Sequence, residues 1–450
     1  MAGAASASAT LAAFVADTAW EDLPGEVRHQ ARRSLLNFVG CALGASSEPA
    51  TAAMAEVLAA AGGTGPATLI GRPERLAMLG AAGVNAMAGN LFDFDDTHLA
   101  TVIHPTAPVA PVALALAERD HVPGRDLLLA LALGIEVACR IGNAVSPAHY
   151  ARGWHITATC GVFGAAAAAA RLLGIGPRAG ADALGIAASE SAGLVENLTT
   201  AAKNVGVANA ARNGLFAALM ARAGYAAAPR AIEGPLGWAR ASGDEPDRAR
   251  MLDGLGTQWE INANAFKPYP SGVVLHAVAD ACIALRREHG IDPSTVAAVT
   301  VAGDALLLAR GDRAVADERD ARVSIQHTAA VALMTGAAGL DQYAPEMAMD
   351  PAVAAFRARV VPVLDGSLPK GAARVELRLA DGRHLARTVL HARGSLESPL
   401  SDAEIEEKVR GLSRRSAWRG DIDAVIDRIW RIEETEDAAE LCRALAAPGG

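Results

Sequence analysis

Apolar residues recur every three to four positions along the first 265 residues, with polar residues between them. This spacing predicts helices. Several of the expected ends carry the residues that start or stop helices, such as Pro49 before one segment and Gly62-Gly63 after it. The expected helices lie at 8–20, 26–43, 49–61, 75–92, 111–119, 124–146, 158–174, 178–192, 205–223 and 229–232.

The pattern changes after residue 265, where alternating runs rich in β-branched residues appear and predict strands. Two of these runs flank Asp381-Gly382, a dipeptide typical of a two-residue hairpin turn. The strands expected here lie at 295–301, 374–379 and 384–390, and the helices at 271–288, 324–336 and 351–357.

These patterns predict a mainly α protein with two domains. Residues 1–265 and 395–450 contain only expected helices and a short extended piece, so they form one large all-helical domain. Residues 266–394 mix strands with helices, which is typical of a smaller α+β domain.

Composition narrows the classes of partner. Hydrophobic residues make up 51% of the 450 residues, enough for large cores, while aromatic residues make up only 4%, which favours closely packed helices of small residues. The net charge is −9 and no basic tract occurs, so we expect no nucleic-acid partner. A small anionic substrate is still allowed, because local cations matter more than the total charge.

The cysteines are scattered and form no Cys-x-x-Cys pair, which argues against a zinc ribbon or an iron–sulfur cluster. Such a set is typical of reduced thiols in a cytoplasm, where we expect the protein. The most apolar run, Leu127–Cys139, contains Glu136 and is shorter than a membrane span, so we expect no membrane partner. The five cysteines are Cys41, Cys139, Cys160, Cys282 and Cys442.

The densest cluster of candidate chemistry begins at Asp93, where three aspartates, a threonine and a histidine occupy six positions. If the preceding helix continues, Asp93 and Thr97 share one of its faces. Pro105 favours a loop conformation for His104. Carboxylates, a hydroxyl and an imidazole at such a corner suit proton transfer. The same aspartates could instead cap a helix or hold a divalent metal through their oxygens.

Two further candidates precede helices of small residues. His155 follows Gly153-Trp154 near an expected helix start, where the helix dipole favours anions. Lys203 also stands ahead of an alanine-rich helix. The alternatives are a structural histidine with satisfied hydrogen bonds and a solvated surface lysine.

Candidates also gather at the expected domain boundary. Pro268 and Pro270 restrict the backbones of Lys267 and Tyr269, so this lysine is held in place by a rigid loop. The remaining candidates in the smaller domain are Ser271, His276 and His327, and for the two histidines a structural role is the alternative.

The chain lacks the common cofactor motifs. No Gly-x-Gly-x-x-Gly, no Walker lysine loop and no His-Glu-x-x-His occurs in the sequence. We therefore expect neither a cofactor nor a metal ion.

Taken together, these motifs resemble those of the MmgE/PrpD family, which includes 2-methylcitrate dehydratase, cis-aconitate decarboxylase and iminodisuccinate epimerase. The chain departs from some members at His327, where they carry tyrosine, and at Gly272, where they carry cysteine or histidine. The matching motifs are Asp93-Phe-Asp-Asp-Thr-His98 with His104-Pro105, Gly153-Trp-His-Ile-Thr157, Lys203 with Ala211-Arg-Asn-Gly214, Ile232-Glu-Gly-Pro-Leu-Gly237, and Lys267-Pro-Tyr-Pro-Ser271 with His276.

The resemblance implies a helical domain built from both chain ends, an inserted α+β lid, a homodimer and a site between the domains. The residues implied to line that site are Asp93, Thr97, His104, His155, Lys203 and Lys267. From their chemistry we expect His104 and His155 to act as base and acid, Lys203 and Lys267 to hold carboxylates, and Asp93 to orient a histidine. The residues that we expect to bind substrate are Thr97, Tyr269, Ser271, His276 and His327.

The leading functional hypothesis is a cofactor-independent hydro-lyase that dehydrates a small hydroxylated di- or tricarboxylate such as 2-methylcitrate or citrate. It would remove a proton next to a carboxylate, where preorganised cations stabilise the extra negative charge. Decarboxylation of the cis-aconitate type and dicarboxylate epimerisation proceed through the same carbanion and stay open. A carboxylate-binding paralogue without activity is the alternative outside enzymes.

Overall fold

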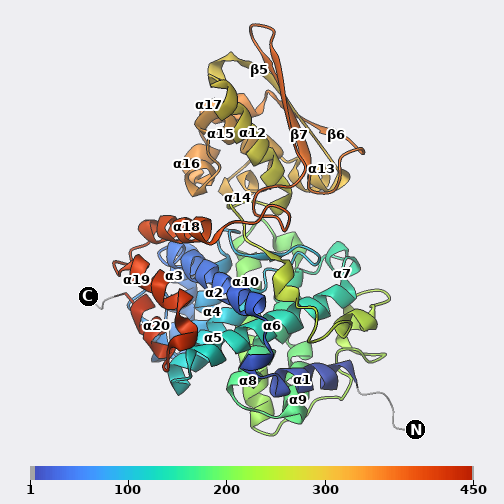
Figure 1. Cartoon of the computed structure of the whole chain (residues 1–450), viewed down its shortest axis with the longest axis vertical. Helices are drawn as coiled ribbons and strands as arrows, with labels where there is room; N and C mark the ends of the chain where they lie inside the picture. The colour runs from blue at the N-terminus through green and yellow to red at the C-terminus, as the bar shows by residue number, and fades with distance from the viewer. Residues whose placement is uncertain (1–5, 448–450) are drawn as a thin grey trace. The chain divides into compact units, whose positions relative to one another are not determined.

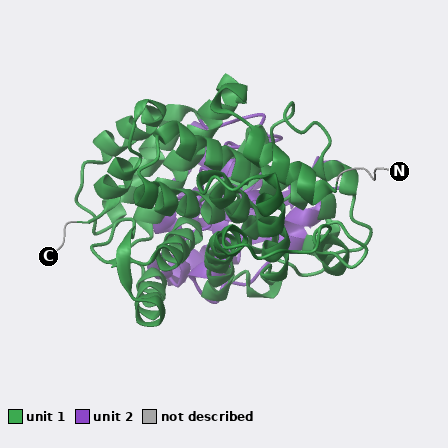
Figure 2. Ribbon diagram, turned by 90° about the horizontal axis from the view of Figure 1, so that it is seen from below, with its two compact units in different colours: residues 1–91, 95–265, 401–450 green, residues 92–94, 266–400 purple. Residues whose placement is uncertain are grey.

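The computed structural model describes residues 6–447 and divides into two compact units. Figure 2 colours the segments of each unit. Unit 2 ends six residues beyond the expected boundary at 394 and takes in a short segment from the middle of the first domain. Unit 1 comprises Met1–Leu91, Asp95–Ala265 and Ser401–Gly450, and unit 2 comprises Phe92–Phe94 and Phe266–Leu400.

Unit 1 is mainly helical, as the apolar periodicity predicts (Figure 1). It also contains two short β-pairs, which were not predicted. Its helices are α1 (Ala7–Asp17), α2 (Gly25–Gly44), α3 (Pro49–Gly62), α4 (Met78–Asn90), α5 (Thr106–Asp120), α6 (Gly124–Val145), α7 (Ala148–Ala151), α8 (Ile156–Leu172), α9 (Pro177–Ser189), α10 (Ala201–Arg222), α11 (Trp238–Ser242), α18 (Asp402–Arg415), α19 (Ile422–Trp430) and α20 (Ala439–Leu445). Its strand pairs are β1 (Thr64–Thr68) with β2 (Arg75–Leu76), and β3 (Thr97–His98) with β4 (Asn264–Ala265).

Helices α6 and α8 cross at two glycines, Gly134 and Gly164, which have no side chains. A Cβ atom on Gly134 would lie 2.7 Å from the Gly164 carbonyl oxygen, and one on Gly164 would lie 2.6 Å from the Gly134 carbonyl oxygen. The two backbones therefore touch, and α10 packs on the other side of α8 at Gly214 in the same way. Small residues decide how closely the central helices of unit 1 approach.

Helix α6 is longer than the apolar run that predicts it. It extends over 22 residues, close to the predicted bounds 124–146, and by length and composition it could cross a membrane. However, 94% of its apolar window is buried inside the protein. Its polar residues are buried too: Glu136 and Arg140 form an ion pair of 2.6 Å with no exposed surface. In this structure α6 is a core helix.

Several predicted helix bounds shift where turns intervene. Helix α4 ends at Asn90, because Asp93 adopts a positive φ of 54° that no α-helix allows, so Asp93 and Thr97 do not share a helix face. Helix α5 begins at Thr106 and includes Pro111. Helix α10 begins at Ala201, which places Lys203 in its first turn. No helix forms at 229–232, where the chain turns.

Unit 2 contains a four-stranded sheet in the order β6-β5-β7-β8. Strand β5 (Val296–Gly303) pairs antiparallel with β7 (Ala373–Leu379), and β7 forms the predicted hairpin with β8 (His384–Val389). Strand β6 (Val360–Leu364), which pairs parallel with β5, was not predicted from the sequence. The helices of unit 2 are α12 (His276–His289), α13 (Ala305–Gly311), α14 (Glu318–Ala321), α15 (Ile325–Thr335), α16 (Pro345–Ala348) and α17 (Pro351–Arg357).

One face of this sheet forms the core of unit 2. Along β7, buried and exposed residues alternate, and the buried set includes Val375 and Leu377. These side chains cluster with apolar residues of α12 and α15, such as Cys282 and Val331. The period of two in the sequence therefore marks the face that the helices cover.

Candidate active site

The loop between β3 and α5 carries His104 and is tightly folded. Strand β3 is anchored by its pairing with β4, and the backbone N–H of His98 donates to the Ile103 carbonyl at 2.8 Å. Within this turn Val102 adopts a φ of 58°, a strained conformation for a β-branched residue. Its N–H donates to the His98 carbonyl at 2.8 Å. The sequence places His104 on a loop but does not reveal this strain.

The hydrogen bonds of His104 define its tautomer. Its Nδ1 atom lies 2.8 Å from the main-chain oxygen of Asp96, and a carbonyl oxygen can only accept. In the neutral ring, Nδ1 therefore carries the proton and Nε2 carries the lone pair. Thr97, expected to bind substrate, places its hydroxyl 3.2 Å from the same Nδ1 atom.

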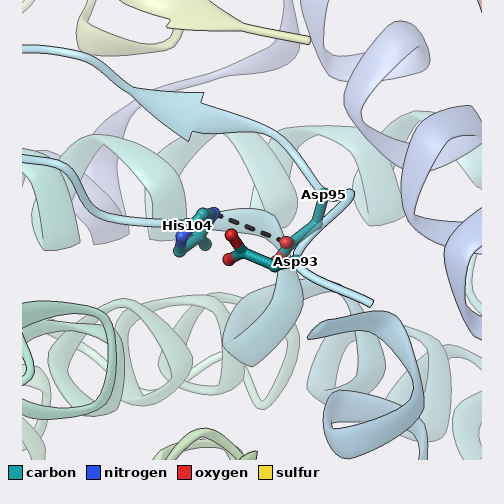
Figure 3. A group of neighbouring side chains, drawn as sticks. All are labelled: Asp93, Asp95 and His104. Atoms are coloured by element: carbon teal, nitrogen blue, oxygen red, sulfur yellow. Dashed lines mark ion pairs between the residues drawn. The ribbon is translucent and has the colours of Figure 1, made fainter. Parts of the chain in front are cut away.

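Asp95 is the carboxylate of unit 1 that faces His104. Its Oδ1 atom lies 3.4 Å from His104 Nδ1, an ion-pair contact rather than a hydrogen bond, because the proton on Nδ1 points to the Asp96 carbonyl (Figure 3). Asp95 is buried, and such a carboxylate stabilises an imidazolium when Nε2 takes up a proton. Asp93, expected to orient a histidine, is shown beside them in Figure 3 and belongs to a segment of unit 2.

A chain of amides links Asp95 to the start of α10. The Asn90 side chain donates to Asp95 Oδ2 at 2.7 Å, and the Asn204 side chain donates to the Asn90 side-chain oxygen at 3.0 Å. Lys203 precedes Asn204 and is buried, with 6% of its surface exposed. The first turn of α10, with its cation, therefore lies next to the segment that holds His104.

His155 is the residue that precedes α8, and it lies near His104 in the fold. The N–H of His104 donates to Thr157 Oγ1 at 3.0 Å, and Thr157 is in the first turn of α8. The N–H of His155 donates to the Gly193 carbonyl at 3.1 Å. A Cβ atom on Gly193 would lie 2.7 Å from the Ala158 Cβ, so the loop before α10 touches α8 at a point where only glycine fits. Unit 1 thus brings His104, His155 and Lys203 onto adjoining segments.

Asp96 is fully buried beside the histidine. Its Oδ2 atom accepts a hydrogen bond from Thr106 Oγ1 at 2.5 Å and another from the Asn264 side chain. Burial raises the pKa of Asp96 to about 7; the hydrogen bond from Thr106 opposes this shift, and the nearby charge of Asp95 adds to it. Asp96 therefore gains or loses its proton near neutral pH.

Lys267 is bound within unit 2. Its Nζ atom lies 3.0 Å from a carboxylate oxygen of Asp93 and 3.0 Å from the Asp93 carbonyl oxygen, and it donates to the Ser271 carbonyl at 3.3 Å. Only 3% of its side chain is exposed. The rigid loop holds Lys267 in place. The lysine contacts the carboxylate of Asp93.

The other candidates of unit 2 are tied into local contacts. The Tyr269 hydroxyl donates to Asp280 at 2.6 Å, and burial raises its pKa above the usual range. Ser271 is fully buried, and its carbonyl accepts from His276 Nε2 at 3.3 Å. His327 donates through Nε2 to the Gln342 carbonyl, and burial lowers its pKa to about 4. Substrate binding by these four residues stays a prediction.

The structure also shows which contributors the sequence analysis overlooked. Asn264 and Glu260 lie far along the chain from His104 and have no local signal, because only folding brings β4 beside β3. The Glu260 carboxylate accepts from His98 Nε2 at 2.9 Å and fixes the base of the turn. The ligand atoms of Asp93, Asp95 and His104 lie within 4.8 Å of one another, and such a group could hold a metal ion. The absence of a metal site stays a prediction.

Fold and site define a two-unit, mainly α protein with a buried histidine–carboxylate pair. The MmgE/PrpD N-terminal domain matches residues 9–250, and the MmgE/PrpD C-terminal domain matches residues 269–432. The chain therefore belongs to the MmgE/PrpD family, as its motifs predict.

Curated relatives match most of this chain. A cis-aconitate decarboxylase-like protein of Aspergillus oryzae is 28% identical, over 98% of this chain and 97% of its own. The cis-aconitate decarboxylase of Mus musculus is 29% identical over 85% of this chain and 81% of its own, and that of Homo sapiens is 28% identical over 85% and 82%. Two of these relatives are thus named as cis-aconitate decarboxylases and the third as cis-aconitate decarboxylase-like.

Proposed function

We propose that this protein is a lyase that decarboxylates a small unsaturated tricarboxylate of the cis-aconitate type, with His104 as the proton carrier. The observation that carries the proposal is the Nδ1–H of His104 directed at the Asp96 carbonyl, which leaves Nε2 to exchange protons. The names of the relatives favour decarboxylation over the dehydration that the sequence analysis placed first.

The proposed step needs one proton donor and at least one cation. When the bond to a departing carboxylate breaks, carbon dioxide leaves and the electron pair stays on an allylic carbanion next to another carboxylate. The Nε2 proton of a protonated His104 then passes to the distal carbon, and Asp95 stabilises the imidazolium beforehand. Lys203 is proposed to bind a remaining carboxylate, since a preorganised cation in a buried site stabilises the growing charge.

Dehydration of a hydroxylated tricarboxylate is the second candidate function. That reaction needs both a base and an acid, and the fold places two histidines, His104 and His155, on adjoining segments of unit 1. His104 would remove the proton, and His155 would protonate the leaving hydroxyl. The two functions differ in their products.

Product analysis by NMR tests the proposal. The protein is incubated with cis-aconitate, citrate and 2-methylcitrate in D₂O. Release of carbon dioxide from cis-aconitate, with one deuteron on a product carbon, supports decarboxylation. Loss of water from citrate or 2-methylcitrate without carbon dioxide supports the second candidate. Turnover of none of these acids contradicts the proposed function.

Two variants test the assigned residues. His104→Gln removes the proton carrier, so kcat falls at least about a hundredfold. His121→Asn replaces an exposed histidine at the end of α5 and serves as the control with full activity. An active His104→Gln enzyme would exclude His104 as the proton carrier.

Lys203→Ala tests carboxylate binding in unit 1. A charge-assisted contact contributes roughly 1.5–3 kcal/mol, so we expect kcat/KM to fall about ten- to a hundredfold. Lys370→Ala, at an exposed position of unit 2, is the matched control and should leave kcat/KM unchanged. Equal activity of both variants would remove Lys203 from the site.

A further inference from the structure

We infer that Asp96 is a positioning residue for His104, with Thr106 and Asn264 as its partners. The inference rests on the proposed function of His104. It assigns a role to Asp96, which contacts the histidine ring through its main-chain carbonyl. It concerns unit 1 alone.

The main chain of Asp96 holds the ring. Its carbonyl oxygen accepts the Nδ1 proton of His104 at 2.8 Å, so the position of this one carbonyl sets both the ring orientation and the tautomer. A shift of the peptide between residues 96 and 97 would weaken that hydrogen bond and allow the proton to move to Nε2.

The side chain of Asp96 holds the same peptide from two directions. Thr106 donates to its Oδ2 atom from the first residue of α5, two positions after His104. Asn264 donates to the same oxygen from β4, the partner strand of β3. The Asp96 carboxylate therefore connects its own end of the loop 96–106 to Thr106 at the other end and to Asn264 on β4. His104 lies in this loop.

The burial of the Asp96 carboxyl lowers the stability of the folded protein. The residue has no exposed surface, and its Oδ1 atom finds no hydrogen-bond partner within residues 6–447. A buried polar atom without a partner costs free energy that an apolar residue of similar size would not. Stability alone therefore does not account for a carboxylate here, whereas placing the His104 ring does.

In the described part of the chain, few titratable groups lie near the Asp96 carboxyl. The titratable groups around Asp96 are Asp95 beside it, His104 at its carbonyl, and Cys139 on α6, whose pKa is raised by burial and by nearby carboxylates including Asp96. Thr106 and Asn264 carry no charge. Substitutions at these two partners therefore loosen the carboxylate without adding or removing a titratable group.

Thr106→Val is the test variant, because it keeps the shape and removes the donor. Ser8→Ala is the matched control, since Ser8 donates to the buried carboxylate of Glu233 at 2.7 Å elsewhere in unit 1. We expect similar losses in thermal stability for both, with kcat reduced about tenfold for Thr106→Val only, at unchanged KM. Equal kcat values for both variants and the wild type would overturn the inference.

A second readout needs no turnover. In protein labelled with ¹⁵N-histidine, the signals of His104 are assigned by their absence in His104→Gln. The wild type should show the Nδ1–H tautomer, and Thr106→Val and Asp96→Asn should shift the ring toward Nε2–H. An unchanged tautomer in both variants would overturn the inference, while an active His104→Gln enzyme would overturn the proposed function instead.

Discussion

At the scale of single residues, the chain combines side chains whose roles the sequence indicates with others that only the fold explains. Pro105 correctly predicts a loop at His104, and the carboxylate of unit 1 that faces His104 is Asp95. The role expected for Asp93 stays a prediction. Helical spacing would place Asp93 and Thr97 on one face, but the helix ends at Asn90. Side-chain geometry beyond a helix end follows from tertiary contacts.

The pKa of Asp96 predicts how stability depends on pH. Because burial raises this pKa from 3.8 to about 7, the folded protein binds one proton more than the unfolded chain between those values. The contribution of Asp96 to the free energy of unfolding is therefore largest below pH 3.8 and falls as pH rises to about 7, by at most about 1.4 kcal/mol per pH unit.

Asp96→Asn removes this proton equilibrium. Urea unfolding of wild type and variant between pH 4 and pH 8 gives their difference in free energy, which should decline with pH up to about 7 and then stay constant. A difference that does not change with pH would show that Asp96 titrates normally.

Val102 tests whether the turn before His104 is strained. A β-branched residue at a φ of 58° costs roughly 1–2 kcal/mol, and glycine avoids that cost. We expect Val102→Gly to be at least as stable as the wild type, and more stable than Val102→Ala, which keeps a Cβ atom. Thermal unfolding compares the three proteins, and a less stable glycine variant would argue against strain at this position.

At the scale of elements, periodicity predicted the helices well and their junctions poorly. Helices α2, α3, α6 and α9 lie within a few residues of their expected bounds, because apolar spacing and terminal prolines and glycines are local signals. Strand β6 was missed, since its pairing with β5 depends on residues more than 50 positions apart. The contacts between α8 and the loop before α10 are equally non-local.

Gly193 is predicted to be essential for that contact. Gly193→Ala places a Cβ atom 2.7 Å from that of Ala158 at a φ of 152°, so the start of α8 with His155 must move. We expect lower thermal stability and a clear loss of kcat. Gly174→Ala is the control, since that glycine also has a positive φ of 62° but has no neighbour within 4 Å of the added atom.

A double mutant separates the clash from the backbone strain. Ala158→Gly removes the atom that the new Cβ would meet, so combining it with Gly193→Ala should restore part of the lost activity. Losses that simply add would mean that the two positions do not interact.

At the scale of the whole molecule, a short segment of unit 2 interrupts unit 1 in the sequence. Phe92–Phe94 belongs to unit 2 although unit 1 precedes and follows it. Its Asp93 pairs with Lys267, and Phe92 lies beneath the Arg322 guanidinium at 5.3 Å. The aspartate motif is therefore divided between the units, which neither spacing nor composition could indicate.

The pair Asp93–Lys267 allows a test of the predicted carboxylate contact of Lys267. Lys267→Met leaves a carboxylate without its cation and should lower both stability and turnover. Asp93→Asn combined with Lys267→Met should recover stability, because the unpaired charge is gone. If turnover stays low in the double variant but is kept by Asp93→Asn alone, Lys267 also acts on the substrate. Recovery of turnover together with stability would limit Lys267 to its ion pair.

The sequence by itself determined the mainly α character, the hairpin, the family and the short set of residues worth testing. Those features depend on periodicity, turn chemistry and motifs, which are local properties of the chain. The tertiary structure decided the tautomer of His104, its contact with Asp95, the burial of Asp96 and the pairing of Lys267 with Asp93. Each of these depends on atoms brought together from distant segments or across a turn, where a hydrogen bond or a desolvated charge follows from three-dimensional distance rather than from spacing along the chain.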